Sequence, residues 1–211
     1  MVTIPPFYSN TKDNTHCYQA VLKMILAANT GKKYTWKKLD QITGKDPDKW
    51  TWPMIGLIHM KNIGYDVISI GSFDYGRFLK EGKKYLVFRS GVYIANEQVK
   101  HSNIKKAQKE ASIYLQSDIN IKRNAVTKDI KKYIDDGYYV VPNINAKTLS
   151  KKEGYSGHFV LIYKYTEKSV IVHDPGLPGR PSRKISWETF ISAWAYPNKT
   201  SCRIYAFKYT L

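Results

Sequence analysis

Between residues 14 and 27 the chain reads NTHCYQAVLKMILA, in which a short polar segment gives way to apolar residues. The apolar positions recur at i, i+3, i+4 and i+7, the spacing of one helix face. This pattern predicts a helix that buries a single stripe and leaves Gln19 and Lys23 outside it. The stripe comprises Cys17, Ala20, Val21, Met24, Ile25 and Ala28.

Cys17 falls in the first turn of this predicted helix. We expect Asn14 or Thr15 to cap the helix start by accepting a backbone N–H, and Gly31 to end the helix. The positive end of the helix dipole favours a thiolate over a thiol at such a position. A free cysteine is also a small and readily buried side chain, so simple packing is the alternative to a nucleophilic role.

The composition is that of one folded domain, which we assign to residues 1–211. The length of 211 residues allows one sizeable core, and a hydrophobic content of 43% with five tryptophans excludes a disordered chain. No apolar run approaches the roughly 18 residues of a membrane helix. Two cysteines are too few for a disulfide framework, and we expect no bridge between Cys17 and Cys202.

The formal net charge of +17 raises the question of a nucleic-acid partner, since lysine-rich surfaces attract phosphate backbones. The lysines are spread along the whole chain, mostly in pairs, and show no recognition-helix, zinc-finger or RNA-binding signature. We therefore expect a solvated basic surface and no specific nucleic-acid partner, with a preference for anionic partners as the alternative. The opening residues, MVTIPPFYSN, lack the features of a secretory signal, so we expect a cytoplasmic protein.

Helical patterns dominate the first half of the chain and strand patterns the last third. Helices are predicted over 35–44, 51–64, 73–82, 127–137 (capped by Thr127) and 186–194 (capped by Ser186), with a polar, mostly helical surface segment over 96–114. Strands are predicted over 65–70, 83–90, 138–145, 157–166, 168–174 and 202–211. This order predicts an α+β fold in which an N-terminal helical half packs on a C-terminal antiparallel sheet.

The segment GHFVLIYKYTEKSVIVHDPG, residues 157–176, is predicted to form a hairpin that turns near Thr166 and Glu167. With an odd number of loop residues, His158 and Asp174 would be directly paired across the two strands. Paired side chains share a face, so the carboxylate could accept the imidazole N–H and leave the other ring nitrogen free for a thiol. A two-residue turn would shift the register by one and put the two side chains on opposite faces.

A cysteine, a histidine and an aspartate in this order, with the cysteine on an early helix, are typical of papain-like hydrolases. The opening PPFYSNTKDNTHCYQAVLKMIL resembles the family pattern of an extended P-x-Y-S-Q segment, a polar loop and the nucleophilic cysteine before a Q-A-x-L-x-M-x-L helix. The later segment GHFVLIYKYTEKSVIVHDPGLPGRPSRKISWETFISAW is similar to the family elements G-H-F-V and D-P-G-L-P. The chain thus resembles the papain-like cysteine peptidases related to the bacteriocin-leader-processing domains of export transporters, and in particular their stand-alone soluble relatives.

The resemblance covers nearly the whole chain and implies a papain-like fold. It also implies that Cys17 is the nucleophile, His158 the general base and acid, and Asp174 the residue that orients the histidine. The family's glutamine, which helps to stabilise the oxyanion, falls on Asn10, whose side chain is shorter by a methylene. The role could still be filled through a shifted loop, by Asn14, or by the Cys17 backbone N–H.

The function expected from these residues is a cysteine hydrolase, most simply a peptidase, that acts through a thioester acyl-enzyme on a peptide or acyl substrate. We expect a monomer with no cofactor, no metal and no membrane partner. Two alternatives stay open: an acyltransferase with the same three residues, and a catalytically weak binding module for a peptide or anionic partner, which the departure at Asn10 favours. We assign His16 to the surface and His173 to a structural role.

The loops that would set specificity are predicted at 145–157 and 177–184.

Overall fold

The computed structural model describes residues 2–210 and is built around an eight-stranded sheet. The strands are β1 (Tyr65–Ile70), β2 (Asn120–Ile121), β3 (Tyr139–Asn145), β4 (Gly157–Phe159), β5 (Leu161–Tyr165), β6 (Ser169–Asp174), β7 (Arg180–Ser186) and β8 (Ile204–Tyr209). Their order is β2-β1-β8-β3-β5-β6-β7, with β4 also paired to β3. Within the described residues β1 and β2 pair in parallel, and the other pairs are antiparallel.

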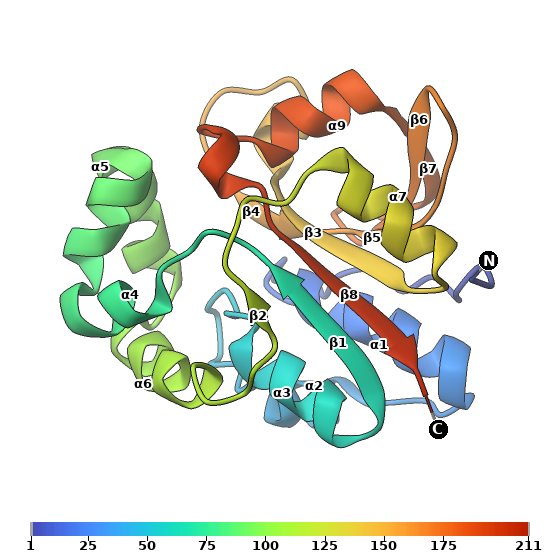
Figure 1. Cartoon of the computed structure of the whole chain (residues 1–211), viewed down its shortest axis with the longest axis horizontal. Helices are drawn as coiled ribbons and strands as arrows, with labels where there is room; N and C mark the ends of the chain where they lie inside the picture. The colour runs from blue at the N-terminus through green and yellow to red at the C-terminus, as the bar shows by residue number, and fades with distance from the viewer. Residues whose placement is uncertain (1, 211) are drawn as a thin grey trace.

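Helices cover the sheet on both faces (Figure 1). They are α1 (Cys17–Thr30), α2 (Trp36–Thr43), α3 (Met54–Asn62), α4 (Tyr75–Glu81), α5 (Lys83–His101), α6 (Ile104–Tyr114), α7 (Thr127–Asp135), α8 (Ala146–Leu149) and α9 (Trp187–Trp194), with a short 3₁₀ turn η1 (Lys199–Ser201). The helices α1 to α6 contribute to one apolar core, and α7 and α9 to a second core across the sheet. The α+β prediction is therefore correct.

The first four residues of strand β3, Tyr139 to Pro142, are all apolar and all buried. Tyr139 and Val141 belong to the core under α1, whereas Val140 and Ile144 belong to the core under α7 and α9. Successive side chains of a strand point to opposite faces, so a strand covered on both sides is apolar at nearly every position. A central strand of this kind fixes the layers on either side of it.

The first helix begins at Cys17 and ends at Gly31 as predicted, but it is more deeply buried than a single stripe. Tyr18, Gln19 and Leu22 are buried as well, because α1 lies between the sheet and the other helices of its layer. The prediction that Gln19 lies outside the stripe is wrong: its Nε2 donates to the hydroxyls of Thr43 and Thr51, both at 2.8 Å. A buried amide needs such partners, and the last residue of α2 and the loop after it supply them.

The predicted strand over 83–90 is wrong, since these residues form the first part of α5. Tyr85 and Leu86 are both buried while Phe88 is 73% exposed, a distribution that an alternating strand would not produce. The β-favouring residues of this segment are overridden by packing against α4 and α6. Gly91, with φ of 83°, then bends the helix, a conformation that suits glycine.

Most other predicted elements are present near their predicted bounds. Ser186 caps α9, accepting the Thr189 N–H as predicted. Thr127 is not a cap, because the N-cap of α7 is Val126, whose N–H donates to the Asp129 carboxylate. The sequence did not predict β2, β7 or α8.

Strand β1 from the first half of the chain pairs with β8 near the end of the described residues. The helical half therefore contributes strands to the same sheet, and the assignment of one domain to residues 1–211 stays a prediction. Among residues 2–210, no helix has the length and apolar character needed to span a membrane.

Tyr18 and Phe159 form a contact between the start of α1 and β4. Their ring centroids are 4.9 Å apart, and both side chains are buried. The Tyr18 hydroxyl donates to the Pro53 carbonyl at 3.1 Å. Gly56 in α3 makes room for this ring, since a Cβ built there would lie 2.6 Å from the Tyr18 hydroxyl oxygen.

We expect Gly56→Ala to lower the free energy of unfolding by about 1–3 kcal/mol, because the added methyl group overpacks the Tyr18 site. Gly76→Ala is the matched control: Gly76 is also helical, and a Cβ there makes only an ordinary contact at 3.4 Å. Urea denaturation of both variants checks the prediction. An equal, small effect of the two changes would show that Tyr18 has room to move.

Candidate active site

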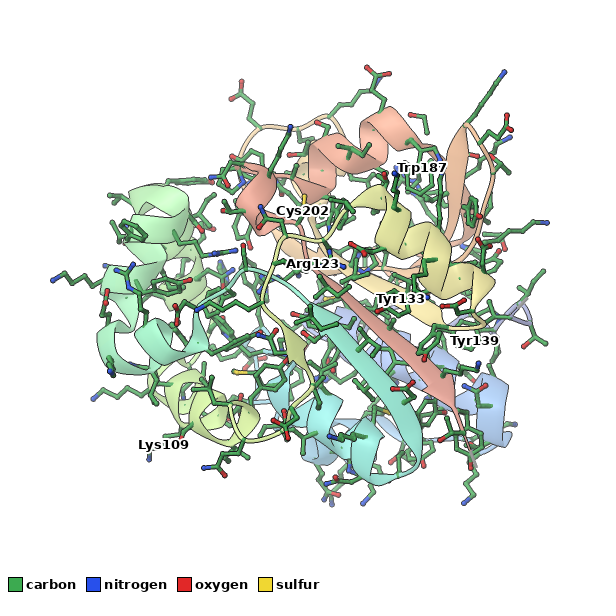
Figure 2. All side chains as sticks on the ribbon, in the orientation of Figure 1. Lys109, Arg123, Tyr133, Tyr139, Trp187 and Cys202 are labelled. Atoms are coloured by element: carbon green, nitrogen blue, oxygen red, sulfur yellow. The ribbon has the colours of Figure 1, made fainter. Side chains whose placement is uncertain are left out.

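Cys17, the first residue of α1, is a free thiol with a partly exposed side chain. Two adjoining hollows meet at this residue. We call the hollow that also contains His158 and Asp174 the histidine pocket, and the one that contains Arg203 the arginine pocket. The chain's second cysteine, Cys202, lies just before β8 in the opposite core (Figure 2). Of the two cysteines, Cys17 is therefore the one whose thiol lies where a ligand can bind.

His158 and Asp174 meet as the sequence predicted. His158 Nε2 lies 2.7 Å from Asp174 Oδ1, and both side chains are buried. A carboxylate accepts from an imidazole N–H, so Nε2 carries the proton and Nδ1 is the nitrogen left for the thiol.

The predicted hairpin register is wrong, although the two side chains meet. His158 pairs with Ile144 of β3 rather than with β6, and the β5–β6 pair places Leu161 opposite His173. The register also shifts within the β5–β6 pair and again within β6–β7, next to Asp174. Such β-bulges turn side chains toward new directions, and here they accompany the contact that simple pairing was expected to make.

The electrostatic setting favours a thiolate beside an imidazolium. Burial raises the pKa of the Cys17 thiol, but the hydrogen bond and the charge of His158 lower it, and the net change is downward. Burial lowers the pKa of His158, while Asp174 and Cys17 raise it by more. Burial raises the pKa of the Asp174 carboxyl, but His158 holds it well below the ordinary range. A thiolate of this kind is the reactive form of cysteine.

Two further groups hold the Asp174 carboxylate in place. Arg183 Nη1 donates to Asp174 Oδ2 at 2.8 Å, and the Gly176 N–H donates to Oδ1 at 3.0 Å. The sequence analysis missed Arg183, because the segment 177–184 was predicted as a loop and most of it belongs to β7. Only the pairing of Val172 with Arg183 across β6 and β7 brings this guanidinium to the site.

The histidine pocket is lined by both segments that the sequence singled out as specificity loops. The segment 145–157 contributes Ala146, Leu149, Ser150, Ser156 and Gly157, and the segment 177–184 contributes Leu177, Pro178, Arg180 and Arg183. The first segment includes the short helix α8, and the second is part loop and part strand.

Asn10 and Asn14 form a chain of side-chain contacts before the helix. Asn10 Oδ1 accepts the backbone N–H of Thr11 and of His16, at 2.9 and 2.7 Å, which fixes its amide so that Nδ2 donates to Asn14 Oδ1 at 2.9 Å. Asn14 lines the histidine pocket beside Cys17, and Asn10 is not among the lining residues. Neither Asn14 nor Thr15 caps α1, since the N-cap is His16 and no side chain accepts from the helix there.

The surface assignment of His16 is wrong. Its side chain is buried, its Nδ1 lies 3.3 Å from Asp13 and its Nε2 lies 3.1 Å from Asp40. His173 is structural as expected: it accepts the Ser182 N–H at Nδ1, so Nε2 carries the proton and donates to the Pro5 carbonyl at 2.9 Å. Neither histidine lines the pocket of His158.

Within residues 2–210, no three histidine, cysteine, aspartate or glutamate side chains gather in a way that would hold a metal ion.

We compared the sequence and the fold of the chain with those of known proteins. A family model described as the peptidase C39 family matches residues 112–197, which include His158 and Asp174. The peptidase domain of Streptococcus ComA, a bifunctional ABC transporter involved in quorum sensing, superposes with a TM-score of 0.52 and 14% identity, covering 99% of this chain and 100% of that domain. The chain resembles the C39 peptidases. The resemblance inferred from the sequence and the papain-like α+β fold are thereby confirmed.

A C39-like peptidase from Bacillus anthracis matches with a TM-score of 0.35 and 18% identity, covering 52% of this chain and 60% of that one. No curated protein sequence matches this chain. The C39 likeness thus comes from the family model over the histidine and aspartate segments and from the fold of the whole chain, which includes the cysteine helix.

We expect iodoacetamide to alkylate Cys17 roughly tenfold or more faster than Cys202 at pH 6.5, below the ordinary thiol pKa of about 8.5. The reason is that the pKa of Cys17 is lowered, whereas burial raises the pKa of Cys202 to about 11. His158→Gln should raise the pKa of Cys17 and slow its labelling at this pH. Mass spectrometry of tryptic peptides over a pH series measures both rates; equal rates for the two cysteines would contradict the thiolate.

Proposed function

We propose that the protein is a cysteine peptidase that cleaves its substrate through a thioester on Cys17. The observation that carries this proposal is the buried His158–Asp174 contact at 2.7 Å beside a thiol whose pKa is lowered by the same histidine. Such an arrangement supplies a nucleophile, a proton carrier and an orienting carboxylate in one pocket. The C39 likeness supports the same class of reaction.

The reaction begins when His158 holds the proton of Cys17 and the thiolate attacks the substrate carbonyl, forming the C–S bond of a tetrahedral intermediate. The imidazolium then gives this proton to the leaving amine as the C–N bond breaks, which leaves a thioester. Water, deprotonated by the now neutral ring, attacks the thioester. The C–S bond breaks, the carboxylic acid product leaves and the thiolate–imidazolium pair is restored.

The oxyanion of each intermediate needs hydrogen-bond donors. We assign one of them to the side-chain Nδ2 of Asn14 and the other to the Cys17 backbone N–H at the start of α1. Asn10 is then a positioning residue: because its Nδ2 donates to Asn14 Oδ1, the Nδ2 of Asn14 is turned away from Asn10. This revises the sequence-based assignment, in which Asn10 itself was the donor.

The test of the function is incubation of the purified chain with a peptide library, followed by mass spectrometry. We expect cleaved peptides and, at short times, an acyl adduct on Cys17. Cys17→Ala should abolish both, and Cys202→Ser, the matched control at the other cysteine, should retain both. If added amines capture the acyl group in place of water, the protein is a transferase. If peptides bind equally to wild type and Cys17→Ala without any adduct, it is a binding module and the proposal is wrong.

The test of the oxyanion assignment is Asn14→Gly, which removes the amide. Asn14 has a φ of 57°, and glycine keeps this left-handed conformation without strain. We expect kcat to fall on the order of 100-fold with little change in KM, since the donor acts on the transition state. An unchanged kcat in this variant, measured on a cleaved peptide, would return the role to Asn10.

A further inference from the structure

The arginine pocket has a lining that the proposed reaction does not use. Besides Cys17, it is walled by aromatic side chains and contains one guanidinium; the principal residues are Trp50, Trp52, Tyr155, Phe159 and Arg203. A neighbouring hollow shares Trp52, Tyr155 and Arg203 with it and adds a second guanidinium, that of Arg89. Neither hollow is lined by an aspartate or a glutamate. The lining therefore combines aromatic and neutral polar side chains with positive charge.

Arg203 has no carboxylate partner among residues 2–210. Its Nη2 donates to the Asn143 side-chain oxygen at 3.3 Å, and its Nε is buried without a hydrogen-bond partner in the described chain. The other groups close to its charge are the hydroxyls of Tyr75, Tyr155 and Tyr205, of which Tyr205 also hydrogen-bonds to the guanidinium. A guanidinium offers five N–H donors and stays charged at all ordinary pH values. Its Nε, at least, is thus a donor without an acceptor in the described chain.

Leaving a charged group partly buried and unpaired costs folding free energy, so an arginine in this position calls for a compensating partner. Among the other arginines, Arg77, Arg123 and Arg183 each pair with a carboxylate, and Arg89 donates to the backbone carbonyls of Ser72 and Thr200. Arg203 differs in facing a hollow that also contains the thiol of Cys17. A planar guanidinium fork matches the two oxygens of a carboxylate.

We propose that the arginine pocket binds a carboxylate of the substrate, held by Arg203, close to the bond that Cys17 attacks. The inference rests on the proposed function and specifies its substrate class: peptides with an acidic group near the cleaved bond. The carboxylate has two sources, the side chain of a glutamate or aspartate and the free carboxyl end of a short peptide. The aromatic walls would cover the methylene groups of such a residue and exclude water from the ion pair.

The test uses peptides that the purified chain cleaves, resynthesised with Glu and with Gln at each position flanking the cleaved bond, and with either a free or an amidated C-terminus. We expect kcat/KM to be about tenfold or more higher for the form with the carboxylate. A Glu-over-Gln difference assigns the carboxylate to a side chain, and an acid-over-amide difference assigns it to the chain end. Arg203→Gln should bring the ratio of kcat/KM between the carboxylate peptide and its neutral counterpart close to one. Arg203→Lys should restore part of this preference for the carboxylate.

Lys208→Gln is the matched control, because Lys208 is an exposed cation in β8, the strand that directly follows Arg203, and its loss changes the net charge equally. Its carboxylate preference should equal that of the wild type. Thermal unfolding shows whether each Arg203 variant is folded. Equal kcat/KM for charged and neutral peptides in the wild type, or a preference that survives in folded Arg203→Gln, would overturn the inference.

A second measurement separates this inference from the proposed function. If no peptide is cleaved, the peptidase proposal fails, and the pocket is judged by protection of Cys17 against iodoacetamide. Acetyl-Glu-Ala amide should protect Cys17 at about tenfold lower concentration than acetyl-Gln-Ala amide, in an Arg203-dependent way. Equal protection by the two compounds would refute carboxylate binding.

Discussion

The candidate site depends on the packing of Tyr18 against Phe159. Tyr18 directly follows Cys17 in α1, and Phe159 directly follows His158 in β4, so the buried contact at 4.9 Å between their rings holds the two backbones together. The hydrogen bonds of the site are too few to fix two separate elements against each other. Burial of the two aromatic rings is what fixes α1 against β4. The tyrosine ring fits there because Gly56 has no side chain.

The sequence predicted those parts of the site that depend on local pattern. The change from polar to apolar residues before Cys17 correctly marked the start of α1, and the positions of His158 and Asp174 near strand ends correctly brought the two together. The argument for their contact was nevertheless wrong in detail. It assumed a regular hairpin, whereas bulges and a separate strand β4 produce the same meeting.

What the sequence could not supply depends on contacts between distant segments. Residues 83–90 have strand-forming side chains, yet packing against α4 and α6 makes them helical. Arg183 and Arg203 were not distinguishable from the other basic residues of a highly charged chain. Their environments differ because one meets Asp174 across a strand pair and the other faces an aromatic hollow without an acid.

The extended segment over residues 5–10 packs against the strand and turn around Asp174. The Pro5 carbonyl accepts from His173, and the Asn10 N–H donates to the Pro175 carbonyl. Ser9 lies so close to Gly179 that a Cβ at position 179 would clash with the Ser9 hydroxyl. These contacts of the extended segment over residues 5–10 thus hold the turn after Asp174 in place. A protease that cut within this segment, or a partner that displaced it, would loosen the Asp174 carboxylate without contacting the thiol of Cys17.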